Sequence, residues 1–335
     1  MRKLSEKLSI TAIKEANASD ALDEAAEFLS QGHLVALPTE TVYGLAADAR
    51  STRAVKRIFE VKGRPAGNPL IVHVDSVGMA RNCVKKWPDL AEKLAGHFWP
   101  GPLSIVLPRS GLIPDIVTGG GATVAVRCPA HPIIQAVLAK CAFPLAAPSA
   151  NRSNRVSPTR ADHVVDQLNG RIPLVLDGGA CDIGIESTVI DISVKVPTLL
   201  RPGSISLYQL QTVLGEVKTY GPHIESGPAK SPGQRQQHYS PKAKLLLNSE
   251  PATMLSQAKQ ALFVVAREQK PPAWPSSQWL RLPNDPDGFA RGLYDSLHSC
   301  DQAGAEIIVV QSLPDCSEWD AIRDRLNRAS VRANT

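Results

Sequence analysis

Residues 62–74 read KGRPAGNPLIVHV, and the expectations for the rest of the chain start from this stretch. Glycines and prolines flank the first two cations, so Lys62 and Arg64 cannot both lie on a regular helix. The apolar run 70–72 predicts a buried strand, with His73 near its end. We therefore expect two cations on a stiff loop between a helix and a strand, an arrangement suited to a phosphorylated ligand. A solvated basic turn accounts for KGRP equally well.

The length and composition indicate a globular protein of two domains. The chain has 335 residues, of which 43% are hydrophobic, and two domains is the usual organisation at this length. No apolar run approaches the roughly 20 residues of a membrane helix. The first residues lack the apolar block of a signal peptide. The six cysteines form no CxxC pair, which predicts reduced thiols and a cytoplasmic protein.

The net charge of +5 is unevenly distributed. Residues 51–160 contain 15 Lys and Arg against 5 Asp and Glu, a surplus of 10, whereas residues 241–335 contain 11 of each kind. The basic region indicates an anionic partner, either a small ligand or a nucleic acid. Long basic blocks with interleaved aromatic residues, which are typical of single-strand binding, are absent.

Polar residues stand at the ends of several predicted strands. The strand 33–37 leads directly into Thr39 and Thr41, which point the same way if the chain stays extended. They are either ligand-binding hydroxyls or a strand edge with satisfied hydroxyls. Arg127 ends the apolar strand that begins at Thr123, and a buried arginine needs an anionic partner. That partner is a ligand carboxylate or an internal acid. The run Gly119–Gly121 is a flexible loop or a place where the backbone approaches a ligand.

Segments 144–151 and 184–191 each place small hydroxyl or amide residues beside an apolar strand, which leaves room for a ligand. Segment 231–241, SPGQRQQHYSP, is polar and without period, so it is a linker or a lid that closes on a ligand. From residue 243, strands alternate with helices, one of them expected over 252–260, which predicts a small α/β domain. We expect a catalytic domain over 1–214, a linker or lid over 215–242 and a C-terminal domain over 243–335.

Several catalytic motifs are absent. The chain contains no P-loop, no G-x-S-x-G elbow and no H-E-x-x-H. The polar residues that remain have few obvious nucleophiles and suit electrostatic clamping of a charged ligand. From the residues alone, we expect an α/β enzyme with an anionic ligand.

Two short motifs carry a resemblance to a known family. KGRP and SAN, with Lys62, Arg64, Ser149 and Asn151, are similar to the K-x-R…S-x-N signature of the YrdC-like threonylcarbamoyl-adenylate synthases. Residues 20–241 resemble that family, and the tail resembles the extra domain of its longer, two-domain members. The other matching blocks, in the family's order, are PTETVYGL, NPLIVH, FWPGPLS, VAVRCP, GIESTVID, RPGSI and SPGQRQQHYSP.

The resemblance implies a nucleotidyltransferase that makes L-threonylcarbamoyladenylate from L-threonine, bicarbonate and ATP, with Mg²⁺ present and pyrophosphate released. A separate transferase would then move the threonylcarbamoyl group to tRNA, onto the adenine beside the anticodon. The implied fold is a twisted α/β sheet with a concave, positive cleft, followed by a smaller Rossmann-like α/β domain.

The resemblance also implies a set of site residues. Lys62 and Arg64 would be catalytic, and no protein residue is expected to bind the metal. The Arg127 fork suits a carboxylate, and hydroxyls at Thr41 and Ser187 suit the hydroxyl of threonine. The residues expected at ATP are Arg64, Asn68, Thr123, Ser149, Asn151, Ser157, Arg201 and Arg235. Those expected at threonine are Thr41, His73, Arg127, the backbone of Ala147, and Ser187.

Two alternatives belong to other classes. An RNA-binding or ribosome-associated module would use the basic central region to bind tRNA or double-stranded RNA, with an affinity that falls steeply with salt. A carbamoyl-transfer enzyme on the same fold would use carbamoyl phosphate and would usually carry further metal-binding or transferase domains, which this chain lacks.

Overall fold

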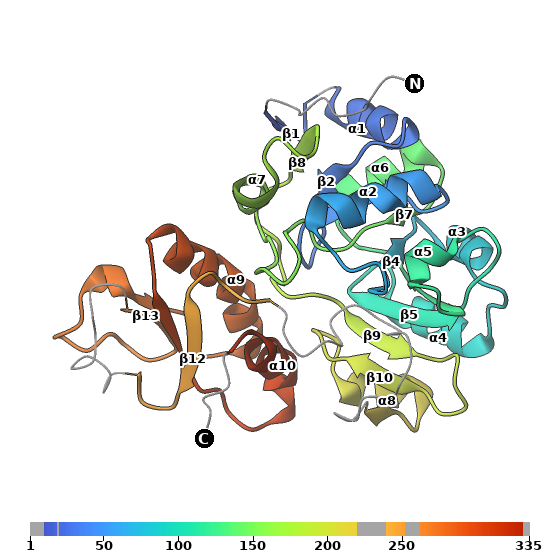
Figure 1. The fold of residues 1–335 in the computed structure, drawn as a ribbon. Helices are drawn as coiled ribbons and strands as arrows, with labels where there is room; N and C mark the ends of the chain where they lie inside the picture. The colour runs from blue at the N-terminus through green and yellow to red at the C-terminus, as the bar shows by residue number, and fades with distance from the viewer. Residues whose placement is uncertain (1–9, 19, 220–238, 252–261, 331–335) are drawn as a thin grey trace.

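The computed structural model of the chain describes residues 10–18, 20–219, 239–251 and 262–330. It contains two units, each built on its own sheet (Figure 1). The strands of the large sheet are β1 (Ala12–Glu15), β2 (Val35–Leu37), β3 (Gly44–Asp48), β4 (Ile71–His73), β5 (Leu103–Pro108), β6 (Thr123–Arg127), β7 (Leu145–Ala146), β8 (Leu174–Asp177), β9 (Thr188–Asp191), β10 (Thr198–Arg201) and β11 (Lys218–Thr219). Their order across the sheet is β1-β8-β2-β3-β7-β4-β6-β5-β9-β10-β11.

The large sheet is mixed. Pairs such as β4–β6 and β5–β9 are parallel, whereas β3–β7, β5–β6 and β9–β10 are antiparallel. Its helices are α1 (Ala21–Ser30), α2 (Thr52–Lys62), α3 (Val77–Cys83), α4 (Asp89–Phe98), α5 (Asp115–Thr118), α6 (Pro132–Cys141), α7 (Ala161–Leu168) and α8 (Leu207–Leu214). The α/β fold predicted from the sequence is confirmed. β11 pairs with β10, although it lies in the stretch expected to be linker.

Side-chain alternation in the central strands separates a core face from a second face. In β6, Val124 and Val126 join the main core, which also takes residues from α2, α4 and α7. Ala125 and Arg127 therefore point to the opposite face. Neighbouring strands follow the same pattern and place a small apolar cluster on that face, consisting of Ile71, Val106, Ala125, Val189 and Leu200. This second face carries the candidate site.

Helix α2 ends where the opening stretch of the sequence begins. Ser51 caps its N-terminus by accepting a hydrogen bond from the Ala54 amide, and Gly63 ends it in the left-handed conformation with φ of 63°. Lys62 is consequently the last helical residue, so the expectation that both cations lie on the loop is wrong for Lys62. Arg64 is on the loop. Helix α2 extends to Lys62 because Gly63, in the αL conformation, is the residue that ends it. Pro65 lies beyond this end.

The smaller unit has the Rossmann-like arrangement expected from the sequence. Its strands are β12 (Lys244–Asn248), β13 (Leu262–Ala266), β14 (Trp279–Arg281) and β15 (Ile307–Gln311), all parallel, in the order β12-β15-β13-β14. Its helices are α9 (Pro286–Gln302) and α10 (Asp320–Ala329), with short 3₁₀ turns η2 (Ser276–Gln278) and η3 (Ser317–Trp319). The helix expected over 252–260 lies outside the described residues, as does the lid residue Arg235.

Two further sequence expectations concern the whole chain. All six cysteines are described and none forms a disulfide. Within the described ranges, none of the helices combines the length and apolar character needed to span a bilayer.

Helices α9 and α10 lie on the side of the small unit that faces the large one (Figure 1). On α9, the His298 ring stacks on His163 of α7 with a centroid distance of 3.9 Å, and its Nε2 lies 3.1 Å from the Ser157 carbonyl. Gly184 packs so closely on α9 that a Cβ there would lie 2.5 Å from the Cα of Arg291. The two units are therefore in direct, tightly packed contact.

This interface gives a pH prediction. Burial, aided by the charge of His163, lowers the pKa of His298 to about 4. The unfolded chain therefore binds more protons than the folded one between about pH 6.5 and pH 4, so the contribution of His298 is complete above this window and is lost as pH falls through it. We expect this residue alone to remove about 2 kcal/mol of unfolding free energy between pH 7 and pH 5.

Urea unfolding at pH 7 and pH 5 checks this expectation. The variant His298→Gln should lose less stability on acidification than the parent, whereas His97→Gln, at an exposed site on α4, should behave like the parent. Equal acid sensitivity in the parent and His298→Gln would contradict the prediction.

Candidate functional site

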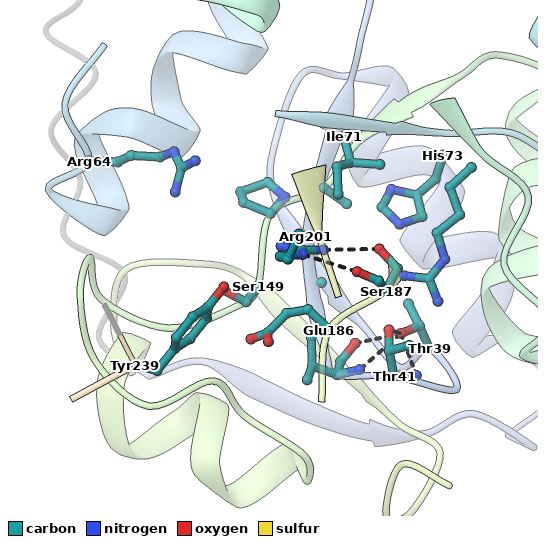
Figure 2. Close-up of a pocket in the computed structure, with 15 residues that line it drawn as sticks. Thr39, Thr41, Arg64, Ile71, His73, Ser149, Glu186, Ser187, Arg201 and Tyr239 are labelled. Atoms are coloured by element: carbon teal, nitrogen blue, oxygen red, sulfur yellow. Dashed lines mark hydrogen bonds between the residues drawn. The ribbon is translucent and has the colours of Figure 1, made fainter. Parts of the chain in front are cut away.

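A pocket lies on the second face of the large sheet, where segments distant in sequence meet (Figure 2). It contains about 510 Å³ of empty space, including the part open to solvent. Its lining residues are Thr39, Thr41, Val42, Gly44, Arg64, Ile71, His73, Arg127, Ala147, Pro148, Ser149, Glu186, Ser187, Arg201 and Tyr239.

The pocket contains most of the residues expected from the sequence. Those that line it are Arg64, Ser149, Arg201, Thr41, His73, Arg127, Ala147 and Ser187. Those that do not are Lys62, Asn68, Thr123, Asn151 and Ser157, although all but Thr123 are buried. Arg235 is outside the described residues. The structure thus brings together residues from both the expected ATP set and the expected threonine set.

Strand register places two of these residues side by side. His73 is the register partner of Arg127 in the parallel pair β4–β6, and Ile71 is the partner of Ala125. Burial and the nearby Arg127 charge lower the pKa of His73 to about 3, so the imidazole is neutral at physiological pH. Its Nδ1 is buried and has no hydrogen-bond partner in the described part of the chain. A neutral imidazole in this position can donate a hydrogen bond to a ligand or accept one from it.

Arg127 has an internal partner. Its Nη2 lies 2.8 Å from Oε1 of Glu40, and both side chains are less than a tenth exposed. Its Nε donates to the Gly101 carbonyl at 3.3 Å. Of the two partners left open by the sequence, the internal acid is therefore present. The sequence reasoning overlooked Glu40, although a carboxylate in a buried segment was itself a signal that a cation lies nearby.

The hydroxyl residues of the pocket are held by their neighbours. Thr39 Oγ1 lies 2.8 Å from Thr41 Oγ1 and donates to the Val42 carbonyl at 2.6 Å, so the two hydroxyls meet although the chain bends at 40–42 instead of staying extended. Across the pocket, Arg201 donates to the Ser187 carbonyl and hydroxyl, at 3.0 Å in each case (Figure 2). Ser187 is also 2.8 Å from the Ser104 hydroxyl. These contacts fix where each hydroxyl points.

Lys62 does not line the pocket, but it holds the segment that carries Ser149 and Asn151. Its ammonium donates to the Ser149 carbonyl at 2.5 Å and also to the Asn151 carbonyl. The amide of Asn151 in turn donates to the Arg155 carbonyl at 2.8 Å. Burial lowers the pKa of Lys62 well below its ordinary value, and Arg64 adds to this. In this structure the S-x-N residues are thus fixed by the lysine of K-x-R. A direct contact of Lys62 with phosphate stays a prediction.

Arg64 extends from its loop toward the other labelled residues of the pocket (Figure 2). It is only 7% exposed, and its guanidinium donates to the Asn68 carbonyl at 3.2 Å and the Pro69 carbonyl at 2.9 Å. The same loop packs on the glycine run, since a Cβ at Gly119 would lie 2.9 Å from the Gly67 carbonyl oxygen. The structure thus shows a close approach of Gly119 to the arginine loop, and an approach of the glycine run to a ligand stays a prediction.

The lining residues outside the expected set include Tyr239 and Glu186. Tyr239, which belongs to the expected lid, is buried, and Glu186 is the residue before Ser187. Ser157, expected at ATP, donates to the Glu186 carboxylate at 2.6 Å. Burial opposes ionisation of Glu186, but Arg325 and Arg201 outweigh it and lower the pKa of this carboxyl to about 2. Like Glu40, Glu186 is an acid in a segment with many apolar residues, and this was the only sequence signal that it has a buried cationic partner.

Comparison with known proteins identifies the family. The family model described as "Telomere recombination" matches residues 27–203, and the model described as "Threonylcarbamoyl-AMP synthase, C-terminal domain" matches residues 205–331. The chain belongs to the threonylcarbamoyl-AMP synthase family. The Pyrococcus abyssi threonylcarbamoyl-AMP synthase is 40% identical over 317 residues, which cover 91% of this chain and 93% of that protein.

Two more relatives of this family extend the comparison. The Bacillus subtilis threonylcarbamoyl-AMP synthase is 38% identical and covers 92% of each chain. The crystal structure of Pyrococcus abyssi Sua5 complexed with L-threonine has a TM-score of 0.86 and 38% identity, covering 92% of this chain and 94% of that one. Both units of this chain therefore have counterparts in the family.

Proposed function

We infer that this protein synthesises L-threonylcarbamoyladenylate from L-threonine, bicarbonate and ATP, with release of pyrophosphate. One observation carries the inference: Arg64, Arg127, Ser149 and Ser187 line a single pocket, in a chain of this family. These four residues lie far apart in the sequence, and a structural role alone would not require them to converge.

The threonine end of the proposed site is the pair of strands β4 and β6 with the segments around them. Arg127 supplies a guanidinium for the threonine carboxylate, and Thr41 or Ser187 supplies a hydroxyl for the threonine hydroxyl. The relative solved with L-threonine supports a threonine site in this fold. Ile71, the member of the apolar cluster that lines the pocket, suits the methyl group of threonine.

The ATP end comprises Arg64, Arg201 and Ser149. Transfer at a phosphorus atom depends on positioning and on neutralising charge more than on covalent help from the protein. Arg64 and Arg201 enter the pocket from two different segments, and Lys62 holds the Ser149 loop through its carbonyls. We propose that the arginines neutralise the phosphates and that Ser149 accepts or donates a hydrogen bond to them. Asn68, Thr123, Asn151, Ser157 and Arg235 stay predictions for ATP.

The chemistry follows in two steps. The threonine amine and bicarbonate form a carbamate with loss of water. A carbamate oxygen then bonds to the α-phosphorus of ATP, while the bond from that phosphorus to the bridging oxygen breaks and pyrophosphate leaves. The residues bind, orient and neutralise, and no side chain needs to form a covalent bond.

We propose that Mg²⁺ enters with the nucleotide. Among the described residues, no group of three His, Cys, Asp or Glu side chains could hold a metal ion. The two acids nearest the pocket, Glu40 and Glu186, are each paired with an arginine. The donor set therefore fits a metal carried by the phosphates and water. We further propose that the protein acts in the cytoplasm and that its product passes to a separate transferase for tRNA modification.

The direct test measures pyrophosphate release with ATP, threonine and bicarbonate, and identifies the product by mass spectrometry with labelled bicarbonate. We expect release only when all three substrates are present, and a label in the threonylcarbamoyl group of the product. Turnover that does not depend on threonine would reject the proposal. Salt-sensitive binding of structured RNA without turnover would favour the nucleic-acid alternative.

A further inference from the structure

Glu186 connects the pocket to the smaller unit of the protein. Its carboxylate lines the pocket and is 8% exposed. It accepts hydrogen bonds from Ser157 at 2.6 Å, from Tyr294 of α9 at 3.1 Å and from Arg325 of α10 at 2.7 Å. Two of these three donors come from the smaller unit, so that unit takes part in building a pocket wall.

Arg325 is the central donor of this network. Its side chain is completely buried, although it comes from a surface helix of the smaller unit. Besides the carboxylate, its guanidinium donates to the backbone carbonyl of Glu186 at 3.3 Å and to that of Pro202 at 3.0 Å. Its remaining nitrogen donates to Asp324 at 2.8 Å. One side chain thus holds two backbone segments of the other unit.

Those two segments carry pocket residues. Glu186 immediately precedes Ser187, and Pro202 immediately follows Arg201. Arg201 donates hydrogen bonds to Ser187, and both residues line the pocket. Arg325 therefore contacts the residue before Ser187, which is Glu186, and the residue after Arg201, which is Pro202.

The charges give Arg325 a second effect. Arg201 and Arg325 are the two cations that stabilise the Glu186 carboxylate. If Arg325 were removed, a buried carboxylate would remain with Arg201 as its one cation among the described residues. A buried ion that loses its partner attracts any other cation in reach. Arg201 would then turn from the Ser187 hydroxyl toward Glu186, and both pocket residues would lose their present geometry.

We propose that Arg325 is a positioning residue for the active site, by which the C-terminal unit holds Ser187 and Arg201 in place through Glu186 and Pro202. This rests on the proposed function. The C-terminal unit is accordingly a structural part of the site and not only an anchor for the connecting segment.

The test compares Arg325→Met with a matched variant on the same helix, Arg323→Met. Arg323 contacts Asp315, Asp320 and the Pro314 carbonyl, all within the smaller unit. We expect Arg325→Met to raise the KM for threonine about tenfold or more, which is about 1.4 kcal/mol, with a smaller effect on kcat. Arg323→Met should keep the parent KM. Both are measured on the full-length protein, well below its unfolding temperature.

A second change separates positioning from general destabilisation. Glu186→Gln in the Arg325→Met background removes the negative charge that draws Arg201 away from Ser187. The double variant should therefore recover most of the lost threonine affinity. Arg325→Lys keeps a cation without the fork and should fall between the parent and Arg325→Met. This lysine variant also serves if Arg325→Met does not fold.

The outcomes separate this inference from the proposed function. If the parent protein releases pyrophosphate from all three substrates but Arg325→Met or Arg325→Lys keeps the parent KM for threonine, the positioning role is wrong. A KM that Glu186→Gln fails to improve also overturns it. If the parent protein shows no threonine-dependent release, the proposed function fails first.

Discussion

Replacing Arg64 with alanine is expected to lower kcat/KM for ATP by about 1,000-fold or more, the range seen when an arginine that stabilises phosphoryl charge is lost. Arg64 enters the pocket from a loop fixed by its own hydrogen bonds. Arg64→Lys should recover little, because a lysine supplies a point charge and not a planar fork. Pyrophosphate release at varied ATP concentration measures the effect.

The same variant also tests a structural correction. A loop arginine would be expected to contribute little packing, so that alanine leaves the fold unaffected. The structure instead buries Arg64 and uses it to satisfy the carbonyls of Asn68 and Pro69. Loss of these bonds should cost about 1–3 kcal/mol of unfolding free energy. Arg53→Ala, at an exposed position on α2, is the control for both measurements. Near-normal turnover of Arg64→Ala would contradict the proposed site.

The second large effect is expected at Arg127. Arg127→Met removes the proposed carboxylate-binding group and leaves Glu40 buried without its cation. We expect a loss of about 3–5 kcal/mol in stability, which is typical when one partner of a buried ion pair is removed. We also expect kcat/KM for threonine to fall by about 100-fold or more, since a charged hydrogen-bonding partner of the substrate is lost.

The double variant Arg127→Met, Glu40→Gln separates these two losses. Neutralising Glu40 removes the unpaired charge, so urea unfolding should show most of the stability restored. The threonine defect should remain, because no guanidinium is available for the substrate. If the double variant regained activity together with stability, Arg127 would be a structural residue, and the threonine assignment would be wrong.

Local sequence patterns were sufficient for several features. The apolar run at 123–127 predicts a strand that ends at Arg127, and the structure has that strand at the same residues. The glycine and proline content of 62–69 predicts that Lys62 and Arg64 do not both lie on a regular helix, and Gly63 ends α2 between them. These predictions succeed because helix capping and strand alternation depend on residues only a few positions apart.

The partners of the buried charges could not be predicted in the same way. The sequence predicted Lys62 as a cation for a phosphorylated ligand. In the structure its ammonium donates hydrogen bonds to the backbone carbonyls of Ser149 and Asn151. For Arg127 the sequence left open a ligand carboxylate or an internal acid, and Glu40 lies beside it. In both cases the partner is a group that the sequence does not distinguish, either a backbone carbonyl or one acid among many.

The sequence by itself determined the α/β class, the family and the kinds of residue that the site uses. The tertiary structure decided which of those residues share the pocket and which only support it. Arg325 and Glu186 are 139 residues apart, and their contact exists because α10 packs on the other unit. Such pairings depend on strand register and on the packing between units, since the energy of a buried charge is set by what surrounds it in space and not along the chain.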